Sequence, residues 1–166
     1  MRHRIIVVEC KPDKELALWV IRKINIRTKI IHRAHKGGKG MVLDFVRKIS
    51  GVLAIIDEDP GTPRHPLYAE LKPIYHSRYL NVYEYTKNNN IILELRPRLE
   101  GWLLAVMGEA KQRIMPIKDE DLLHLKLSAK PRQIIEILEK TRDKSRILEN
   151  LINNVKEHIC IRTEKI

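Results

Sequence analysis

The chain has no apolar run that approaches the roughly twenty residues needed to cross a bilayer. Residues 1–4 lead directly into a strand-like segment and lack the features of a secretory signal. Cysteine is scarce: Cys10 and Cys160 form no CxxC pair, which argues against a disulfide framework and a zinc ribbon. The seven histidines show no helix-paired metal spacing. We therefore expect a cytoplasmic protein with no membrane partner.

Basic residues, in contrast, are abundant. The 166 residues carry a formal net charge of +11, which favours nucleic acid, DNA or RNA, as the partner. A lysine-rich surface of the kind found in heat-adapted proteins is an equally good explanation of most of this charge. The length suits one domain with one buried core. Acidic clusters in such a basic chain are therefore the more informative feature.

The first half of the chain alternates short apolar runs with helical patterns. Strands are predicted at about 4–9, 28–32 and 52–57, with helices at about 13–24 and 40–49. The order β-α-β-α-β predicts a parallel sheet, and the nearly continuous Ile, Val and Leu content of the first and third runs predicts strands covered on both faces. The fold class is therefore α/β.

The second half is less regular at first. Residues 60–90 read as a long loop with a short helical or extended segment, because prolines and glycine interrupt them. A strand is predicted at 91–95, Pro97 starts a helix with Trp102 in the core, and the chain is helical from about Asp119. We expect a single domain, 1–166, with an α/β core (1–115) and a helical extension (116–166).

Acidic residues follow the first and third predicted strands. Glu9 ends one apolar run and Asp57 and Asp59 end the other, so they are expected at the same edge of a parallel sheet, with Glu58 facing elsewhere. Carboxylates from different strand ends suit Mg²⁺ or Mn²⁺. The alternative is that these acids cap turns and helices, and this alternative is strongest for Asp13, at the start of a predicted helix.

A glycine-rich basic segment, 35–40, precedes the second predicted helix. It is not a Walker A loop, because the spacing fails and no Ser or Thr follows a lysine. Its backbone N–H groups and lysines favour a phosphate cradle, while a strand-to-helix turn that needs glycine is an equal alternative. The candidate phosphate-binding residues are Lys36, Gly37, Gly38, Lys39, Gly40 and Arg64.

The segments 9–13 and 57–59 resemble the Toprim domain, which is shared by type IA topoisomerases, bacterial primases, small ribonucleases that mature ribosomal RNA, and nucleases of the overcoming-lysogenization-defect group. The resemblance covers about residues 1–60. It implies a Rossmann-like fold with a roughly four-stranded parallel sheet flanked by helices. The chain is too short for a complete topoisomerase or primase, which leaves the small nucleases.

The resemblance also implies roles for individual residues. Glu9 would be a general acid/base or metal ligand, Asp57 and Asp59 would hold Mg²⁺, and Asp13 would act in catalysis by supporting a second ion. Residues 98–105 are similar to a later helix of the small nucleases, which makes Glu100 a further metal candidate. A basic residue such as Lys39 would neutralise charge in the transition state.

The position after Glu9 departs from the family, because Cys10 stands where glycine is usual. Three interpretations therefore remain open. The chain is a metal-dependent nuclease or related phosphotransfer protein, a non-catalytic nucleic-acid-binding module with a vestigial metal site, or a nucleotide-binding regulatory protein. The resemblance also allows an oligomer or a partner protein.

Overall fold

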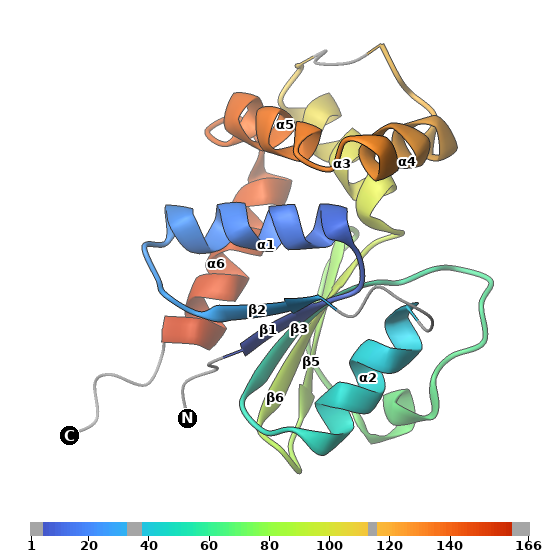
Figure 1. Ribbon diagram of the computed structural model, residues 1–166, viewed down its shortest axis with the longest axis vertical. Coiled ribbons are helices and arrows are strands. Elements are labelled where there is room, and N and C mark those ends of the chain that lie inside the picture. The colour runs from blue at the N-terminus through green and yellow to red at the C-terminus, as the bar shows by residue number, and fades with distance from the viewer. Residues whose placement is uncertain (1–4, 33–37, 113–115, 161–166) are drawn as a thin grey trace.

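The computed structural model describes residues 5–32, 38–112 and 116–160 of the chain (Figure 1). Its strands are β1 (Ile5–Val8), β2 (Lys29–His32), β3 (Val52–Asp57), β4 (Lys72–His76), β5 (Leu80–Tyr85) and β6 (Asn90–Leu95). Its helices are α1 (Lys11–Lys23), α2 (Gly38–Lys48), the short 3-10 helix η1 (Pro66–Glu70), α3 (Leu99–Glu109), α4 (Glu120–Ala129), α5 (Gln133–Thr141) and α6 (Arg146–Cys160).

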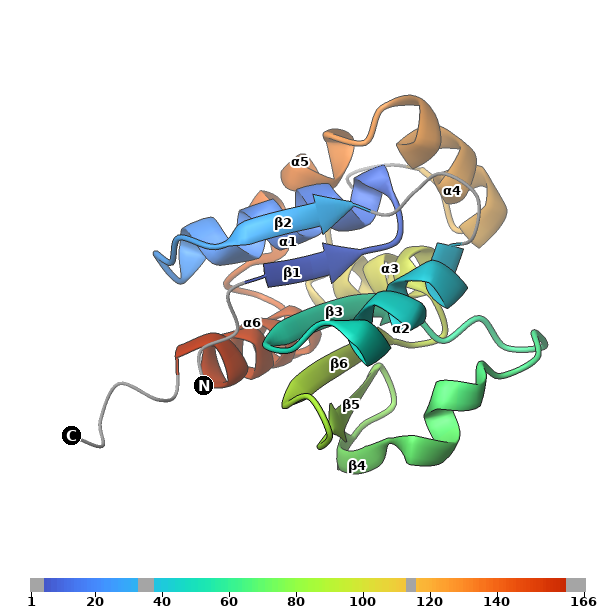
Figure 2. The same cartoon turned by 60° about the horizontal axis from the view of Figure 1, so that its bottom comes forward.

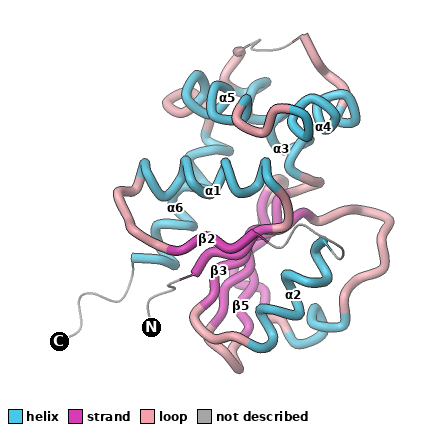
Figure 3. Tube along the Cα trace, viewed as in Figure 1, coloured by secondary structure: helices cyan, strands magenta, loops and turns pink. Residues whose placement is uncertain are grey.

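The strands form one mixed sheet in the order β2-β1-β3-β6-β5-β4. The pairs β1–β2, β1–β3 and β3–β6 are parallel, whereas β5 is antiparallel to both of its neighbours. Helix α2 lies on one face of the sheet, and α1 and α6 lie on the other, as Figures 2 and 3 show. The protein is therefore α/β, with helices on both faces.

The chain order creates a switch point between β1 and β3. From β1 the chain passes through α1 to β2 on one side, and then through α2 to β3 on the other side of β1. Because the two crossovers go in opposite directions, their helices cover opposite faces, and the carboxyl ends of β1 and β3 lie at the switch point where open α/β sheets form a ligand crevice. Glu9 and Asp57 lie at this crevice.

The predicted size of the sheet was wrong. Roughly four parallel strands were expected, but the sheet has six strands and is mixed, because the supposed loop 60–90 contains η1, β4 and β5. Strand β5 carries buried residues on both faces, so it does not alternate clearly. Strand β4 is exposed throughout and contains Pro73, which an edge strand tolerates because its outer N–H groups have no sheet partner.

Two apolar clusters lie on the two faces of the sheet. One contains Val42 and Val46 of α2 with Ile56 of β3, and the other contains Ile6, Leu53 and the predicted core residue Trp102. Buried residues of the helical extension belong to the second cluster, namely Leu123, Leu127, Ile134, Ile137, Leu138, Leu148, Leu151, Val155 and Ile159. The extension therefore packs on the α/β core. In the described part of the chain, no helix is long and apolar enough to cross a membrane.

Asn90 ties the end of α2 to the sheet. Its side chain is fully buried, and Oδ1 accepts a hydrogen bond from the Val52 N–H at 2.8 Å. Its Nδ2 donates to the carbonyls of Val46 and Ile49, both at 2.6 Å. One amide therefore satisfies three backbone groups and fixes where β3 starts.

We predict that Asn90→Ala lowers the free energy of unfolding by about 2–4 kcal/mol, because the Val52 N–H and the Ile49 carbonyl lose their partner and the Val46 carbonyl keeps only a 3.4 Å contact with Asn88 Nδ2. Denaturant titration measures the change. The matched control is Asn153→Ala on the exposed surface of α6, which should change the stability by less than about 0.5 kcal/mol. Equal effects of the two substitutions would contradict this role of Asn90.

Candidate metal centre

Two backbone-to-carboxylate hydrogen bonds connect three elements at the crevice. The Asp57 N–H donates to Glu9 Oε1 at 3.0 Å, which joins the end of β1 to the end of β3. The Leu99 N–H donates to Asp57 Oδ1 at 3.0 Å, which joins β3 to the first turn of α3. Glu9 and Asp57 therefore lie side by side, as their positions after parallel strands predicted.

Asp13 lies in the first turn of α1 and is buried beside this pair. Its Oδ2 accepts hydrogen bonds from the Cys10 N–H at 3.2 Å and from the Cys10 Sγ–H at 3.0 Å. Helix α1 begins at Lys11, so Asp13 caps the helix through the backbone of Cys10. Its other oxygen, Oδ1, is buried without a hydrogen-bond partner among the described residues. The capping interpretation is correct, yet half of this carboxylate remains unsatisfied.

Hydrogen bonds to backbone groups fix the conformation of the turn after β3. Asp59 adopts φ +50°, and its N–H donates to the Pro97 carbonyl at 3.1 Å. Lys39 Nζ donates to the carbonyls of Asp57 and Glu58 at 2.9 and 2.7 Å, and lies 3.8 Å from Asp59 Oδ2. The Lys39 ammonium group thus faces the acidic turn and stabilises it.

Glu58 points away from the other acids, as expected. It forms an ion pair with Arg96 at 2.6 Å. The D-x-D segment therefore sends only its first and third side chains toward the crevice.

Glu100 contributes a further buried carboxylate from α3. Its Oε1 lies 2.7 Å from His124 Nδ1 on α4, and its Oε2 lies 4.0 Å from Arg98 Nε. A Cβ atom at Gly101 would overlap the Glu120 side chain and the Pro97 ring, so glycine permits this close approach of α3 and α4. The extension thereby supplies a partner to a candidate ligand. Sequence reasoning missed His124, because it lies on a helix whose pattern predicts only packing.

Burial and repulsion by neighbouring acids raise the pKa values of Glu9, Asp13 and Asp57. Burial is the main cause for Glu9, whose pKa rises to about 8, and the charge of Asp13 adds to it. Burial likewise raises the pKa of Asp13 to about 6, despite the hydrogen bonds from Cys10, and the charges of Glu100 and Asp59 add to it. The pKa of Asp57 is raised by burial and by Asp13, Glu9, Glu100 and Asp59. The charges of five acidic side chains therefore repel one another at this place, namely those of Glu9, Asp13, Asp57, Asp59 and Glu100.

The glycine-rich segment is only partly described. Lys36 and Gly37 lie outside the described residues. Gly38 and Gly40 lie in the first turn of α2 rather than in a preceding loop, and Gly38 has φ +48°. A Cβ atom at Gly38 would lie 4.0 Å from Glu9 Oε2, which places the start of α2 next to the carboxylates.

Arg64 is engaged elsewhere. Its guanidinium carbon lies 4.7 Å from the centre of the Tyr68 ring. The Tyr68 hydroxyl donates to Glu94, a carboxylate buried in β6 that also accepts hydrogen bonds from Asn81 Nδ2 and the Tyr83 hydroxyl. The loop after β3 is therefore anchored to a separate polar network on the α2 face. A phosphate contact from Arg64 stays a prediction.

No protein-family model, curated protein or solved structure matches this chain. Within residues 5–32, 38–112 and 116–160, no group of three or more His, Cys, Asp or Glu side chains is already arranged around a common ion position. Several of the carboxylates accept hydrogen bonds from backbone N–H groups instead.

The raised pKa of Glu9 predicts the pH dependence of stability. The folded protein binds this proton more tightly than the unfolded chain, so metal-free stability should fall as the pH rises from about 4.5 through about 8. Glu9→Gln keeps an acceptor for the Asp57 N–H but carries no charge. We expect it to unfold at a higher temperature than the parent protein at pH 8.5 in EDTA, with a smaller difference at pH 5.

Thermal unfolding at both pH values tests this expectation. Glu149→Gln on the exposed surface of α6 is the control and should behave like the parent protein at both. A Glu9→Gln variant that is less stable than the parent at pH 8.5 would contradict the strain assigned to Glu9.

Proposed function

We propose that this chain is a Toprim-like, Rossmann-type protein that cleaves nucleic acid with the help of a divalent metal ion. One observation carries the proposal: five carboxylates, from the ends of β1 and β3 and from α1 and α3, gather at the crevice of the sheet, where burial and mutual repulsion raise the pKa values of Glu9, Asp13 and Asp57. Acids that only capped helices would have no reason to converge from separate elements. The acidic residues 9–13 and 57–59, which carry the resemblance, supply four of the five.

The donor set fits Mg²⁺ or Mn²⁺. Both ions prefer oxygen ligands, retain water readily and need few protein carboxylates. The unsatisfied Asp13 Oδ1 and the raised pKa values indicate that the cluster lacks positive charge, which a divalent cation would supply. Glu9, Asp57 and Asp59 would hold the ion, with Asp13 and Glu100 beside a second one. Such an ion would act as a Lewis acid on a phosphate oxygen and would lower the pKa of a water molecule bound to it.

The protein's own residues would orient the reaction. Glu9, held through Oε1 by the Asp57 N–H, can exchange a proton at Oε2, and a pKa near the working pH suits a general acid/base. Lys39 keeps the Asp57–Asp59 turn in place, and its positive charge beside Asp59 would stabilise negative charge on the phosphate. Glu100 is positioned by His124.

One observation favours a second candidate, a non-catalytic nucleic-acid-binding module. The Cys10 thiol occupies Asp13 Oδ2, so this carboxylate offers only one oxygen where a second ion would need it. A protein of this kind would bind nucleic acid in a salt-sensitive manner without turnover.

We predict Mg²⁺- or Mn²⁺-dependent cleavage of DNA or RNA that falls by at least about 100-fold in Asp57→Asn and in Glu9→Gln. The matched control is Glu58→Gln, which changes the acid between Asp57 and Asp59 that pairs with Arg96 instead. It should stay within about threefold of the parent.

Cleavage of labelled strands, with thermal unfolding of each variant as a check of folding, measures these effects. Equal residual cleavage in the folded variants and the parent would overturn the assignment of the site. Binding without any turnover in the parent would support the binding module instead.

A further inference from the structure

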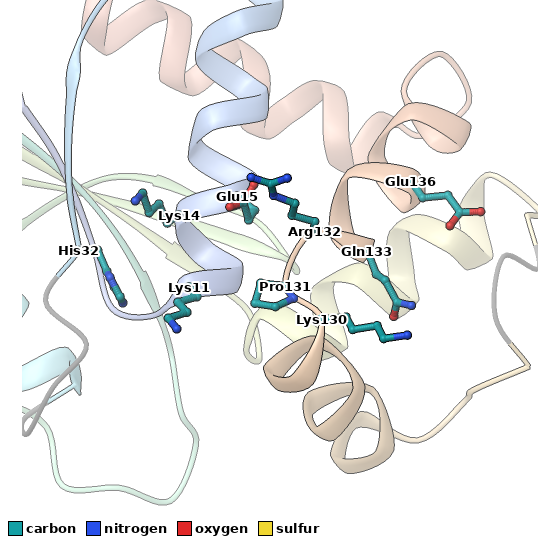
Figure 4. Close-up of a pocket in the computed structure, with 9 residues that line it drawn as sticks. All are labelled: Lys11, Lys14, Glu15, His32, Lys130, Pro131, Arg132, Gln133 and Glu136. Carbon is teal, nitrogen blue, oxygen red and sulfur yellow. The ribbon is translucent and has the colours of Figure 1, made fainter.

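A cavity of about 690 Å³ lies between α1 and the turn that joins α4 to α5 (Figure 4). Figure 4 shows Lys11, Lys14 and His32 on one side, and Pro131 and Arg132 approaching from the extension. The remaining lining residues are Glu15, Lys130, Gln133 and Glu136. Its volume lies in the range of small-molecule sites.

The cations that line this cavity are not neutralised by neighbouring acids. In the described part of the chain, Lys11, Lys14, Lys130 and Arg132 form no ion pair with a carboxylate. Arg96 and Arg98, in contrast, are each neutralised by acids.

The acids of the cavity do not balance these cations. Of its two carboxylates, Glu136 is already paired with Lys140 at 2.8 Å. Glu15 therefore remains as the one lining acid without an ion pair among the described residues. The cavity has an excess of positive charge and attracts an anion.

The cavity also lies at the same edge of the sheet as the carboxylates. His32 ends β2 and pairs in register with Val8, the residue before Glu9. Lys11 follows Cys10 directly at the start of α1. His32, which lines the cavity, therefore lies one strand away from Val8, a spacing of roughly 4.8 Å.

We propose that this cavity binds a phosphate-bearing nucleotide of an unpaired nucleic-acid strand, next to the phosphodiester that reaches Glu9 and Asp57. The inference rests on the proposed nuclease function for the identity of the neighbouring site. The volume accommodates one nucleotide but not the width of a duplex, so the strand must present a splayed nucleotide. A free mononucleotide has the same chemistry, and the experiment separates the two sources.

The test measures affinity without cleavage, in EDTA, with the full-length chain and a short labelled single strand. Lys14→Ala combined with Arg132→Ala removes one cation from each side of the cavity. We expect about tenfold or greater loss of affinity and a salt slope, log Kd against log salt, that is flatter by about 0.7, since one phosphate contact on a single strand contributes about 0.7. Lys11→Ala with Lys130→Ala is a second, independent pair and should behave alike.

The matched control is Lys72→Ala on β4, at the opposite edge of the sheet, where the side chain is 68% exposed. It should change the affinity by less than about twofold. Thermal unfolding confirms that each variant is folded. Unchanged single-strand affinity in both cavity pairs would overturn the inference, and so would an equal loss of duplex binding.

Titration with a free mononucleotide tests whether the cavity binds a mononucleotide instead of a strand. Binding of AMP or UMP that equals that of the strand and is lost in the same variants would also overturn the inference, in favour of a nucleotide-binding regulatory protein. The nuclease proposal fails independently: loss of strand binding in the cavity variants, with no cleavage by the parent, would support the cavity and refute the enzyme. Cleavage by the parent, with unchanged strand affinity in the cavity variants, would support the enzyme and refute the cavity.

Discussion

Mutual repulsion among buried and half-buried carboxylates is the constraint on which the site depends. The bonds from the Asp57 N–H to Glu9 and from the Leu99 N–H to Asp57 hold the acids together where three elements end. Each bond stabilises an ionised carboxylate, but burial opposes ionisation more strongly, and the pKa values of Glu9 and Asp57 rise. Such a cluster stabilises the fold only when protons or cations compensate its charge. This is the physical reason to regard it as a site rather than a set of caps.

The helical extension completes the frame of the site. His124 on α4 contacts Glu100, and Arg98 joins the start of α3 to Glu120 and Asp121. The turn between α4 and α5 closes the basic cavity against α1. A carboxylate centre and a cation-lined cavity would together suit the proposed phosphodiester chemistry, because a metal would act at one phosphate while the cations would hold the strand at the next.

The local part of this arrangement was predictable, and the long-range part was not. Apolar runs ending in Glu9 and Asp57 fixed two parallel strands and their common edge, because residues after parallel strands meet at one side of the sheet. Strands β4 and β5 escaped prediction, since β5 is buried on both faces and β4 is exposed throughout. The cavity joins Lys14 to Arg132 through tertiary packing of α1 on α5, which no local pattern encodes. Arg64 stacks on Tyr68 because a buried Glu94 network, invisible in the sequence, lies beneath it.

The most direct test of the central claim is a crystal structure of the protein soaked in Mn²⁺, with the ion located by its anomalous scattering. The account predicts an ion at the crevice between β1 and β3, bound by oxygens of Glu9, Asp57 and Asp59 at roughly 2.0–2.3 Å. Binding would require Asp59 and the free oxygens of Glu9 and Asp57 to turn toward a common point. An ion bound only elsewhere, with these three carboxylates still on their backbone partners at saturating Mn²⁺, would contradict it.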